Sequence, residues 1–208
     1  MSGAEKKDSL FRKRLFPVVF MFVITLVFIS VTTVIYTFTR DTIELNETIV
    51  LKRSILYAAG VEVPADPHEI DQVYSRRVEE ARVDDTTYYR LSALDSDQVE
   101  NYVVVVQGAG LWGTITAAVG YRENLQELAG IEIIDQNETP GLGARIAEPW
   151  FKRQFRGKTP PLSTVPEDAH AGEQEFQAIT GATNSSNAIR TIINEIAREE
   201  IEKITAVR

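Results

Sequence analysis

A hydroxyl-rich turn near the carboxyl end holds the residues best suited to chemistry. Residues 177–186 read Gln-Ala-Ile-Thr-Gly-Ala-Thr-Asn-Ser-Ser, and isoleucines recur at helical spacing from Ile189 onward. The turn therefore lies at the start of a predicted helix, where backbone N–H groups are unpaired and the helix dipole is positive. Such a helix start can hold a phosphate, and here it would place the Thr183 hydroxyl beside the dipole.

Helix capping alone is the competing explanation for this turn. Asn184, Ser185 and Ser186 are residue types that N-caps prefer, so capping accounts for them without any further function. It does not account for residues 180–183, because two small residues between two threonines leave a bare, accessible backbone. The residue types by themselves leave both explanations open.

Few other side chains are suited to chemistry. The chain has no cysteine, which excludes disulfides, thiolate-bound iron–sulfur clusters and a cysteine nucleophile. His68 and His170 lie in separate polar segments that resemble loops, whereas metal sites need ligands clustered at short spacings. We therefore expect no metal site and no catalytic residue, and any redox chemistry must come from a bound organic cofactor.

The charge of the chain is negative and unevenly distributed. A net charge of −8 argues against nucleic acid as a partner, because binding to a phosphate backbone requires a basic face. Residues 1–14 carry five basic and two acidic side chains, so the remaining residues stand at −11. The two ends of the molecule are therefore expected to face different surroundings.

A long apolar segment follows the basic residues. Residues 15–38 are 24 consecutive residues without a charge, and as a helix they would extend for about 36 Å, enough to cross a hydrocarbon core of about 30 Å. A cleaved signal peptide would have a shorter apolar region and small residues at its cleavage site, which residues 36–40 lack. We predict an uncleaved transmembrane helix, with residues 1–14 in the cytoplasm and the main domain outside it.

Beyond this helix the sequence predicts one α+β domain. Residues 39–99 are interpreted as a linker and helical region, with a helix that ends at Gly60. Residues 100–208 are interpreted as the extracytoplasmic domain, in which a short helix over 148–155 has proline at its first position. A small antiparallel sheet flanked by helices is expected from three predicted strands, over 100–107, 111–119 and 127–135.

Several motifs together resemble one known family. Residues 180–183, Thr-Gly-Ala-Thr, resemble the flavinylation motif of bacterial FMN-binding domains, which occur in the G subunit of Rnf complexes and the C subunit of sodium-pumping NADH:quinone oxidoreductases. Residues 110–113 (Gly-Leu-Trp-Gly), 138–143 (Glu-Thr-Pro-Gly-Leu-Gly) and 150–158 resemble other signatures of that family in order and spacing. The resemblance extends from about Arg40 to the carboxyl end.

The family supplies an expected role for each motif. Its flavin transferase moves FMN from FAD onto the last threonine of the motif as a phosphoester, which implies covalent FMN on Thr183, and its loop corresponding to 138–143 packs on the flavin ring. Trp112 is either a stacking partner of that ring or a core or interface anchor. Gln177 stands where the family usually has Asp, which would slow modification or require a matched transferase. The expected cofactor-binding residues are Thr183, Thr180, Gly181, Ala182, Glu138, Thr139, Leu142 and Trp112.

The resemblance implies an electron-transfer subunit of an Rnf-type or sodium-translocating NADH:quinone oxidoreductase-type complex, anchored in the cell inner membrane by a single pass. It would be a redox subunit rather than an enzyme on its own. Its partners would be other membrane and redox subunits, and a flavin transferase during maturation. Two alternatives come from other functional classes: a stand-alone extracytoplasmic FMN-dependent reductase, and a membrane-anchored binding domain without a cofactor.

Overall fold

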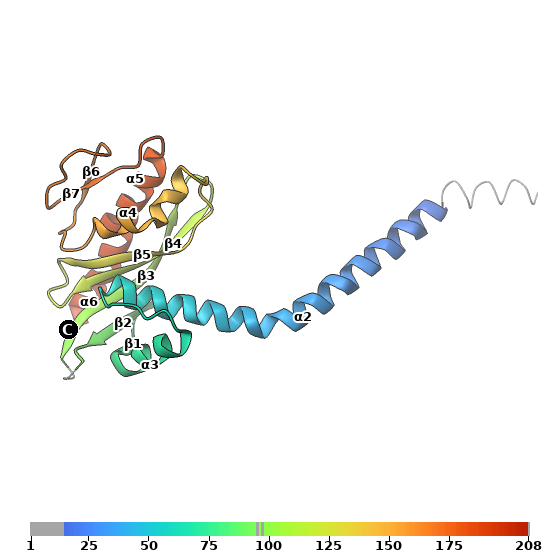
Figure 1. Ribbon diagram of the computed structural model, residues 1–208, viewed down its shortest axis with the longest axis horizontal. Coiled ribbons are helices and arrows are strands. Elements are labelled where there is room, and N and C mark those ends of the chain that lie inside the picture. The colour runs from blue at the N-terminus through green and yellow to red at the C-terminus, as the bar shows by residue number, and fades with distance from the viewer. Residues whose placement is uncertain (1–14, 95, 97, 208) are drawn as a thin grey trace, which may run out of the picture. The chain divides into compact units, whose positions relative to one another are not determined.

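The computed structural model describes residues 15–94, 96 and 98–207. The chain divides into two compact units, Met1–Glu47 and Thr48–Arg208. All strands among the described residues lie in the second unit (Figure 1).

The helix α2 (Phe16–Ala58) is 43 residues long and supplies the described part of the first unit. Its segment Phe16–Arg40 is long and apolar enough to cross a membrane, by length and composition. The hydroxyls of Ser30 and Thr37 donate to carbonyl oxygens four residues earlier, at 2.8 and 2.9 Å, so these polar groups are satisfied inside the helix. Residues 1–14, whose basic side chains gave the predicted orientation, lie outside the described residues.

A five-stranded antiparallel sheet forms the centre of the second unit, with its strands in sequence order. The strands predicted from the sequence correspond to β3, β4 and β5, and the α+β fold class is confirmed. Two further strands precede them. The five strands are β1 (Val78–Val83), β2 (Thr86–Ser92), β3 (Val99–Ala109), β4 (Thr114–Arg122) and β5 (Leu128–Asp135).

Strands β1 and β2 lie within residues 39–99, which the sequence suggested to be a linker and helical region. The sequence of β1, Val-Glu-Glu-Ala-Arg-Val, has one buried residue, Val83, and therefore lacks the apolar alternation that identifies a strand. It is an edge strand, where charged side chains are common. Asp84, with a φ of 49°, begins the tight connection to β2. Pairing with β2, rather than its own pattern, makes this segment a strand.

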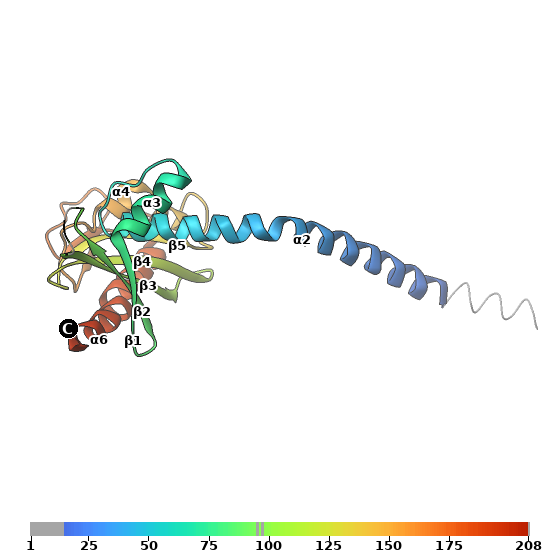
Figure 2. The same cartoon turned by 90° about the horizontal axis from the view of Figure 1, so that it is seen from below.

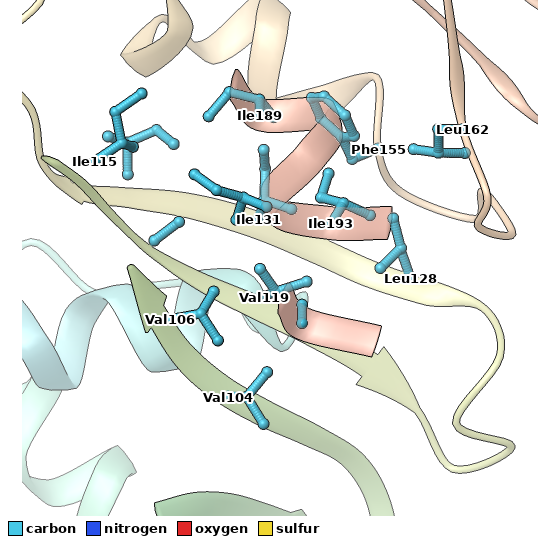
Figure 3. Close-up of a cluster of buried hydrophobic side chains, with 14 of the residues drawn as sticks. Val104, Val106, Ile115, Val119, Leu128, Ile131, Phe155, Leu162, Ile189 and Ile193 are labelled. Carbon is cyan, nitrogen blue, oxygen red and sulfur yellow. The ribbon is translucent and has the colours of Figure 1, made fainter. Parts of the chain in front are cut away.

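Helices cover both faces of the sheet, which explains the unbroken valine run of β3. Val103 packs in a cluster with Ile55 and Leu56 of α2. Val104 and Val106 face the opposite way, into a larger cluster with the helices at the carboxyl end (Figure 3). Figure 2 shows α3 (Pro67–Arg77) and α6 (Arg198–Val207) on opposite sides of the strands.

The last turn of α2 reaches the sheet through two glycines. A Cβ atom at Gly120 would overlap the carbonyl oxygen of Ala58, and one at Gly130 would lie 3.2 Å from the same oxygen. Because only bare backbone permits this approach, the two glycines fix where the helix meets the sheet. Gly60, with a φ of 78°, ends the helix as predicted.

The chain after β5 builds the elements that surround the candidate site. Pro149 is the first residue of α4, as predicted, and Glu148 is its N-cap. The two short strands β6 and β7 pair in parallel in a separate sheet. These elements are η2 (Gly143–Ala147), α4 (Pro149–Arg153), β6 (Ser163–Val165), β7 (Glu175–Gln177), α5 (Thr183–Thr191) and the π-helical η3 (Ile192–Ala197), which continues into α6.

Candidate functional site

Thr183 is the first residue of α5, and its side chain is exposed. The preceding residue, Ala182, is the N-cap, and no side chain makes a capping hydrogen bond there. Gly181 has a φ of 78°, a conformation that glycine adopts without strain. The predicted helix start is therefore present, and it presents the Thr183 hydroxyl without a side-chain cap.

Ser185 and Ser186 do not cap α5, contrary to the capping explanation. Both are buried inside the helix. The Ser186 hydroxyl accepts a hydrogen bond from the backbone N–H of Ile179 at 3.0 Å and donates one to the carbonyl oxygen of Ala182 at 3.1 Å. Ser186 therefore stabilises the turn from its buried side, while Thr180 and Thr183 of the same turn remain exposed.

Glu138 is a buried carboxylate, 4% exposed, that connects three segments. One oxygen, Oε1, accepts hydrogen bonds from the backbone N–H groups of Leu111 at 2.7 Å and Trp112 at 3.2 Å. The other oxygen, Oε2, accepts a hydrogen bond from the Ser185 hydroxyl. Glu138 thus ties the tip of the β3–β4 hairpin to α5. The flavin contact that the sequence suggested for Glu138 stays a prediction, and both oxygens of its carboxylate accept hydrogen bonds from protein donors.

Two glycines of the sequence motifs make room for this carboxylate. A Cβ atom at Gly110 would lie 2.5 Å from Glu138 Oε1, and one at Gly143 would lie 2.7 Å from Oε2. Both distances are shorter than real Cβ atoms tolerate, so a larger residue at either position would displace Glu138. The motifs at 110–113 and 138–143 therefore fit together around one side chain.

Exposed apolar side chains occur on the two segments that Glu138 connects to α5, the β3–β4 hairpin tip and the loop 138–143. A Cβ atom at Gly181 would lie 3.3 Å from Leu142 Cδ2, so the loop 138–143 lies against the turn. This proximity is consistent with the expected contact between the loop and a group attached to Thr183. Leu142 is 45% exposed, and Trp112 at the hairpin tip is 68% exposed. Thr139 is also exposed, and its carbonyl oxygen accepts from the N–H groups of Leu142 and Ala144, both at 3.1 Å.

A charged pair that the sequence did not suggest also reaches this turn. Glu167 Oε2 accepts the backbone N–H of Thr180 at 2.7 Å, and Glu167 Oε1 lies 2.7 Å from Arg145 Nη2. The hydrogen bonds from Arg145 and then from Thr180 lower the pKa of Glu167 from 4.5 to about 2. The same hydrogen bond with Glu167 raises the pKa of Arg145. No local sequence pattern predicts this ion pair, because Arg145 and Glu167 are 22 residues apart.

Gln177 occupies the position where the resembling family has Asp. Its side-chain amide Nε2 donates to the carbonyl oxygen of Ala169 at 2.7 Å. A carboxylate has no hydrogen to donate there. The glutamine therefore holds the loop between β6 and β7 in this chain.

The described residues, 15–94, 96 and 98–207, include no group of three or more metal-ligating side chains that could hold a metal ion. His68 lies in the first turn of α3, where its backbone N–H donates to the capping Asp66 carboxylate at 2.7 Å. The chemically distinctive feature is instead the arrangement around Thr183. An exposed hydroxyl at the positive end of a helix, beside apolar side chains, can accept a phosphate ester that carries a planar apolar ring.

The part of the chain that contains this arrangement matches a known family. Residues 110–198 match the model described as the FMN-binding domain, a range that begins at the β3–β4 hairpin tip and includes Thr183. The resemblance inferred from the motifs is therefore confirmed.

Two curated proteins illustrate the relationship. The C subunit of the Na(+)-translocating NADH-quinone reductase of Vibrio anguillarum is 33% identical over 102 residues, which cover 45% of this chain and 40% of that protein. The G subunit of the proton-translocating ferredoxin:NAD(+) oxidoreductase complex of Clostridium ljungdahlii is 33% identical over 104 residues, which cover 50% of this chain and 53% of that protein. The chain thus spans about half or less of the length of these relatives.

A solved structure shares the fold. The crystal structure of the C subunit of the Na(+)-translocating NADH-quinone reductase from Parabacteroides distasonis superposes with a TM-score of 0.62, over 80% of this chain and 94% of that chain. The sequence identity is 22%, so this likeness shows the fold alone.

Proposed function

We propose, from the match of residues 110–198 to the FMN-binding domain, that this chain is a membrane-anchored electron-transfer subunit with FMN linked to Thr183 through a phosphoester. The observation that carries the proposal is the exposed Thr183 at the start of α5, where no side chain caps the helix. A helix start of this kind favours a phosphate group electrostatically and offers N–H donors to its oxygens. Bound flavin would supply the capacity for one- and two-electron transfer.

The other expected cofactor-binding residues receive distinct roles in this proposal. Thr180, Gly181 and Ala182 shape the backbone that presents the acceptor hydroxyl. Leu142 packs on Gly181 and is 45% exposed, so its outer surface is free to cover an apolar ring. Trp112 and Thr139 are both exposed, and we propose that they contact the bound ring. Glu138 acts indirectly, because its carboxylate is buried and positions the backbone of the hairpin tip by accepting the N–H groups of Leu111 and Trp112.

The partners we propose follow from the names of the relatives. These are subunits of a Na(+)-translocating NADH-quinone reductase and of a proton-translocating ferredoxin:NAD(+) oxidoreductase complex. We place this chain in a complex of one of these two kinds, where it exchanges electrons with neighbouring redox subunits. A flavin transferase would attach the FMN during maturation.

The segment Phe16–Arg40 is proposed as a single-pass anchor in the inner membrane, with the amino end in the cytoplasm and the FMN-binding domain outside it. A covalent tether suits that compartment. FMN that dissociated outside the cytoplasm would not easily be recovered, and a phosphoester removes this loss.

The alternatives have less support. A stand-alone reductase would need an acid or base over the flavin, but Glu138, the candidate that the sequence suggested, is 4% exposed and accepts hydrogen bonds from protein donors at both oxygens. A cofactor-free binding domain would leave the Thr-Gly-Ala-Thr turn as a cap, and α5 has no side-chain capping hydrogen bond.

The attachment is tested by removing one hydroxyl. Thr183→Val keeps the branched shape of the side chain and should abolish both covalent fluorescence on a denaturing gel and the mass increment of FMN. Asn184→Ala is the matched control, because Asn184 is the exposed neighbour of Thr183 and should leave both signals intact. Full flavinylation of Thr183→Val would overturn the proposal.

A further inference from the structure

The Thr-Gly-Ala-Thr turn is held from outside by an ion pair that none of the sequence motifs includes. Arg145 in η2 forms two contacts with the Glu167 carboxylate, Nη2 to Oε1 at 2.7 Å and Nη1 to Oε2 at 3.4 Å. The same Oε2 accepts the backbone N–H of Thr180 at 2.7 Å. One carboxylate therefore connects η2 to the first residue of the turn.

Arg145 is itself fixed by α4. Its guanidinium lies over the ring of Trp150, 5.2 Å from the ring centre, and its Nε is 3.6 Å from the carboxylate of Glu148. Leu142, three residues before Arg145, packs on Gly181. The turn is therefore held at two points, by apolar contact of Leu142 at Gly181 and by the hydrogen bond that the Thr180 N–H donates to Glu167, which Arg145 holds in turn.

The strength of these interactions indicates whether they stabilise the whole domain or only the local conformation of the turn. The side chains of Arg145 and Glu167 are 26% and 18% exposed, and partly exposed ion pairs add little to the stability of a whole domain. A hydrogen bond from a backbone N–H to a carboxylate is, in contrast, strong enough to select one local conformation. The Glu167 carboxyl is ionised at neutral pH, and the hydrogen bonds from Arg145 and Thr180 lower its pKa further, from 4.5 to about 2. Its main effect is thus on the turn, not on global folding.

We propose that Arg145 and Glu167 are positioning residues for the attachment of FMN to Thr183, because they hold the turn in the conformation that the flavin transferase binds. This inference rests on the proposed function. In the transfer, the Thr183 oxygen bonds to the FMN phosphorus of FAD and the phosphoanhydride bond breaks. AMP leaves, and the hydroxyl proton passes to water. Arg145 and Glu167 take no part in these bond changes, and act by raising the fraction of molecules with a competent turn.

This role predicts a specific kinetic signature. When the competent conformation is a fraction of the population, the apparent affinity falls by that fraction while the chemical step in the bound complex is unchanged. Loss of the Thr180 acceptor in Glu167→Ala should therefore raise the apparent KM of the transferase for this protein about tenfold, which corresponds to about 1.4 kcal/mol. The kcat should stay within about twofold. Glu167→Gln should lie between, since its carbonyl oxygen still accepts the Thr180 N–H but its ion pair with Arg145 is lost.

The experiment uses the full-length chain, produced without flavin in a host that lacks the transferase. Initial rates of covalent flavin incorporation are measured with purified flavin transferase and FAD, over a range of concentrations of the chain. Glu127→Ala is the matched control, because it removes another partly exposed ion pair, Arg122 Nε to Glu127 Oε1 at 2.7 Å, at the opposite end of β4. It should behave like the wild type. Thermal unfolding of each variant separates turn effects from folding effects.

Each outcome decides between the two proposals. An unchanged apparent KM in Glu167→Ala and Glu167→Gln, with normal modification of the wild type at Thr183, overturns the positioning role alone. If Glu167→Ala does not fold, Glu167→Gln decides by the same measurement. A lowered kcat with unchanged KM also contradicts the inference. A wild-type chain that the transferase and FAD leave unmodified overturns the proposed function, and the positioning role with it.

Discussion

The carboxylate of Glu138 accepts a hydrogen bond from the hydroxyl of Ser185, which lies 47 residues later in the chain. This contact joins the loop 138–143 to α5, and the same carboxylate holds the backbone of the β3–β4 hairpin tip. Three segments that are distant in the sequence therefore meet at one buried side chain. Thr183, the proposed attachment point of FMN, lies two residues before Ser185, at the exposed start of the same helix.

Ser185→Ala should lower stability without preventing flavin attachment. The substitution leaves a buried carboxylate without one of its donors, which typically costs about 1–3 kcal/mol. Thr183 and the outer side of the turn remain unchanged, so the folded protein should still carry covalent flavin. Chemical unfolding gives the stability, and gel fluorescence gives the modification. Ser186→Ala should behave similarly, because the N–H of Ile179 loses its acceptor. Loss of covalent flavin from either folded variant would contradict these expectations.

Leu142→Ala should leave the covalent attachment of the flavin intact but shift the redox potential of the flavin. Leu142 makes no bond to the cofactor, so Thr183 should remain modified. Losing a contact of about 1.4 kcal/mol from one redox state would change its relative stability tenfold, which is about 30 mV for a two-electron couple. Redox titration of fully flavinylated protein measures this shift. Leu94→Ala is the control, since Leu94 is 78% exposed in the connection between β2 and β3. Identical potentials for the wild type and Leu142→Ala would show that the loop 138–143 is structural.

A reporter fused after Arg208 should report an extracytoplasmic location. The prediction follows from the basic residues before the apolar segment and from the acidic balance of the remainder. A pair of reporters, one active only in the cytoplasm and one active only outside it, provides the measurement and its internal control. Activity of the cytoplasmic reporter would reverse the orientation and remove the reason given for a covalent tether.

Acid should weaken the Glu167 contacts in a defined pH range. The pKa of Glu167 is lowered from 4.5 to about 2 in the folded protein, chiefly by hydrogen bonding from Arg145. Its contribution to stability, which is small because the ion pair is partly exposed, is therefore complete above pH 4.5 and declines as the pH falls towards 2. The difference in unfolding free energy between the wild type and Glu167→Gln should narrow over this range. Chemical unfolding at pH 6, 4 and 3 measures it, and a constant difference would contradict the assignment.

Local patterns in the sequence determined several parts of this protein. The uncharged run over 15–38 was enough to predict the membrane-crossing length of Phe16–Arg40, because helix rise and bilayer thickness fix the requirement. Apolar runs bounded by turns identified β3, β4 and β5. Gly60 and Pro149 marked one helix end and one helix start correctly. The Thr-Gly-Ala-Thr motif predicted an exposed hydroxyl at a helix start, since that feature depends only on neighbouring residues.

Tertiary structure alone decided the rest. The charged edge strand β1 has no strand pattern of its own and forms because β2 offers it hydrogen-bonding partners. The burial of Glu138 depends on donors supplied by the β3–β4 hairpin and by α5, and residue type cannot reveal which donors a carboxylate will meet. The link from Arg145 through Glu167 to Thr180 spans separations of 22 and 13 residues. Short-range periodicity carries no information at such separations, because packing of the whole domain brings these groups together.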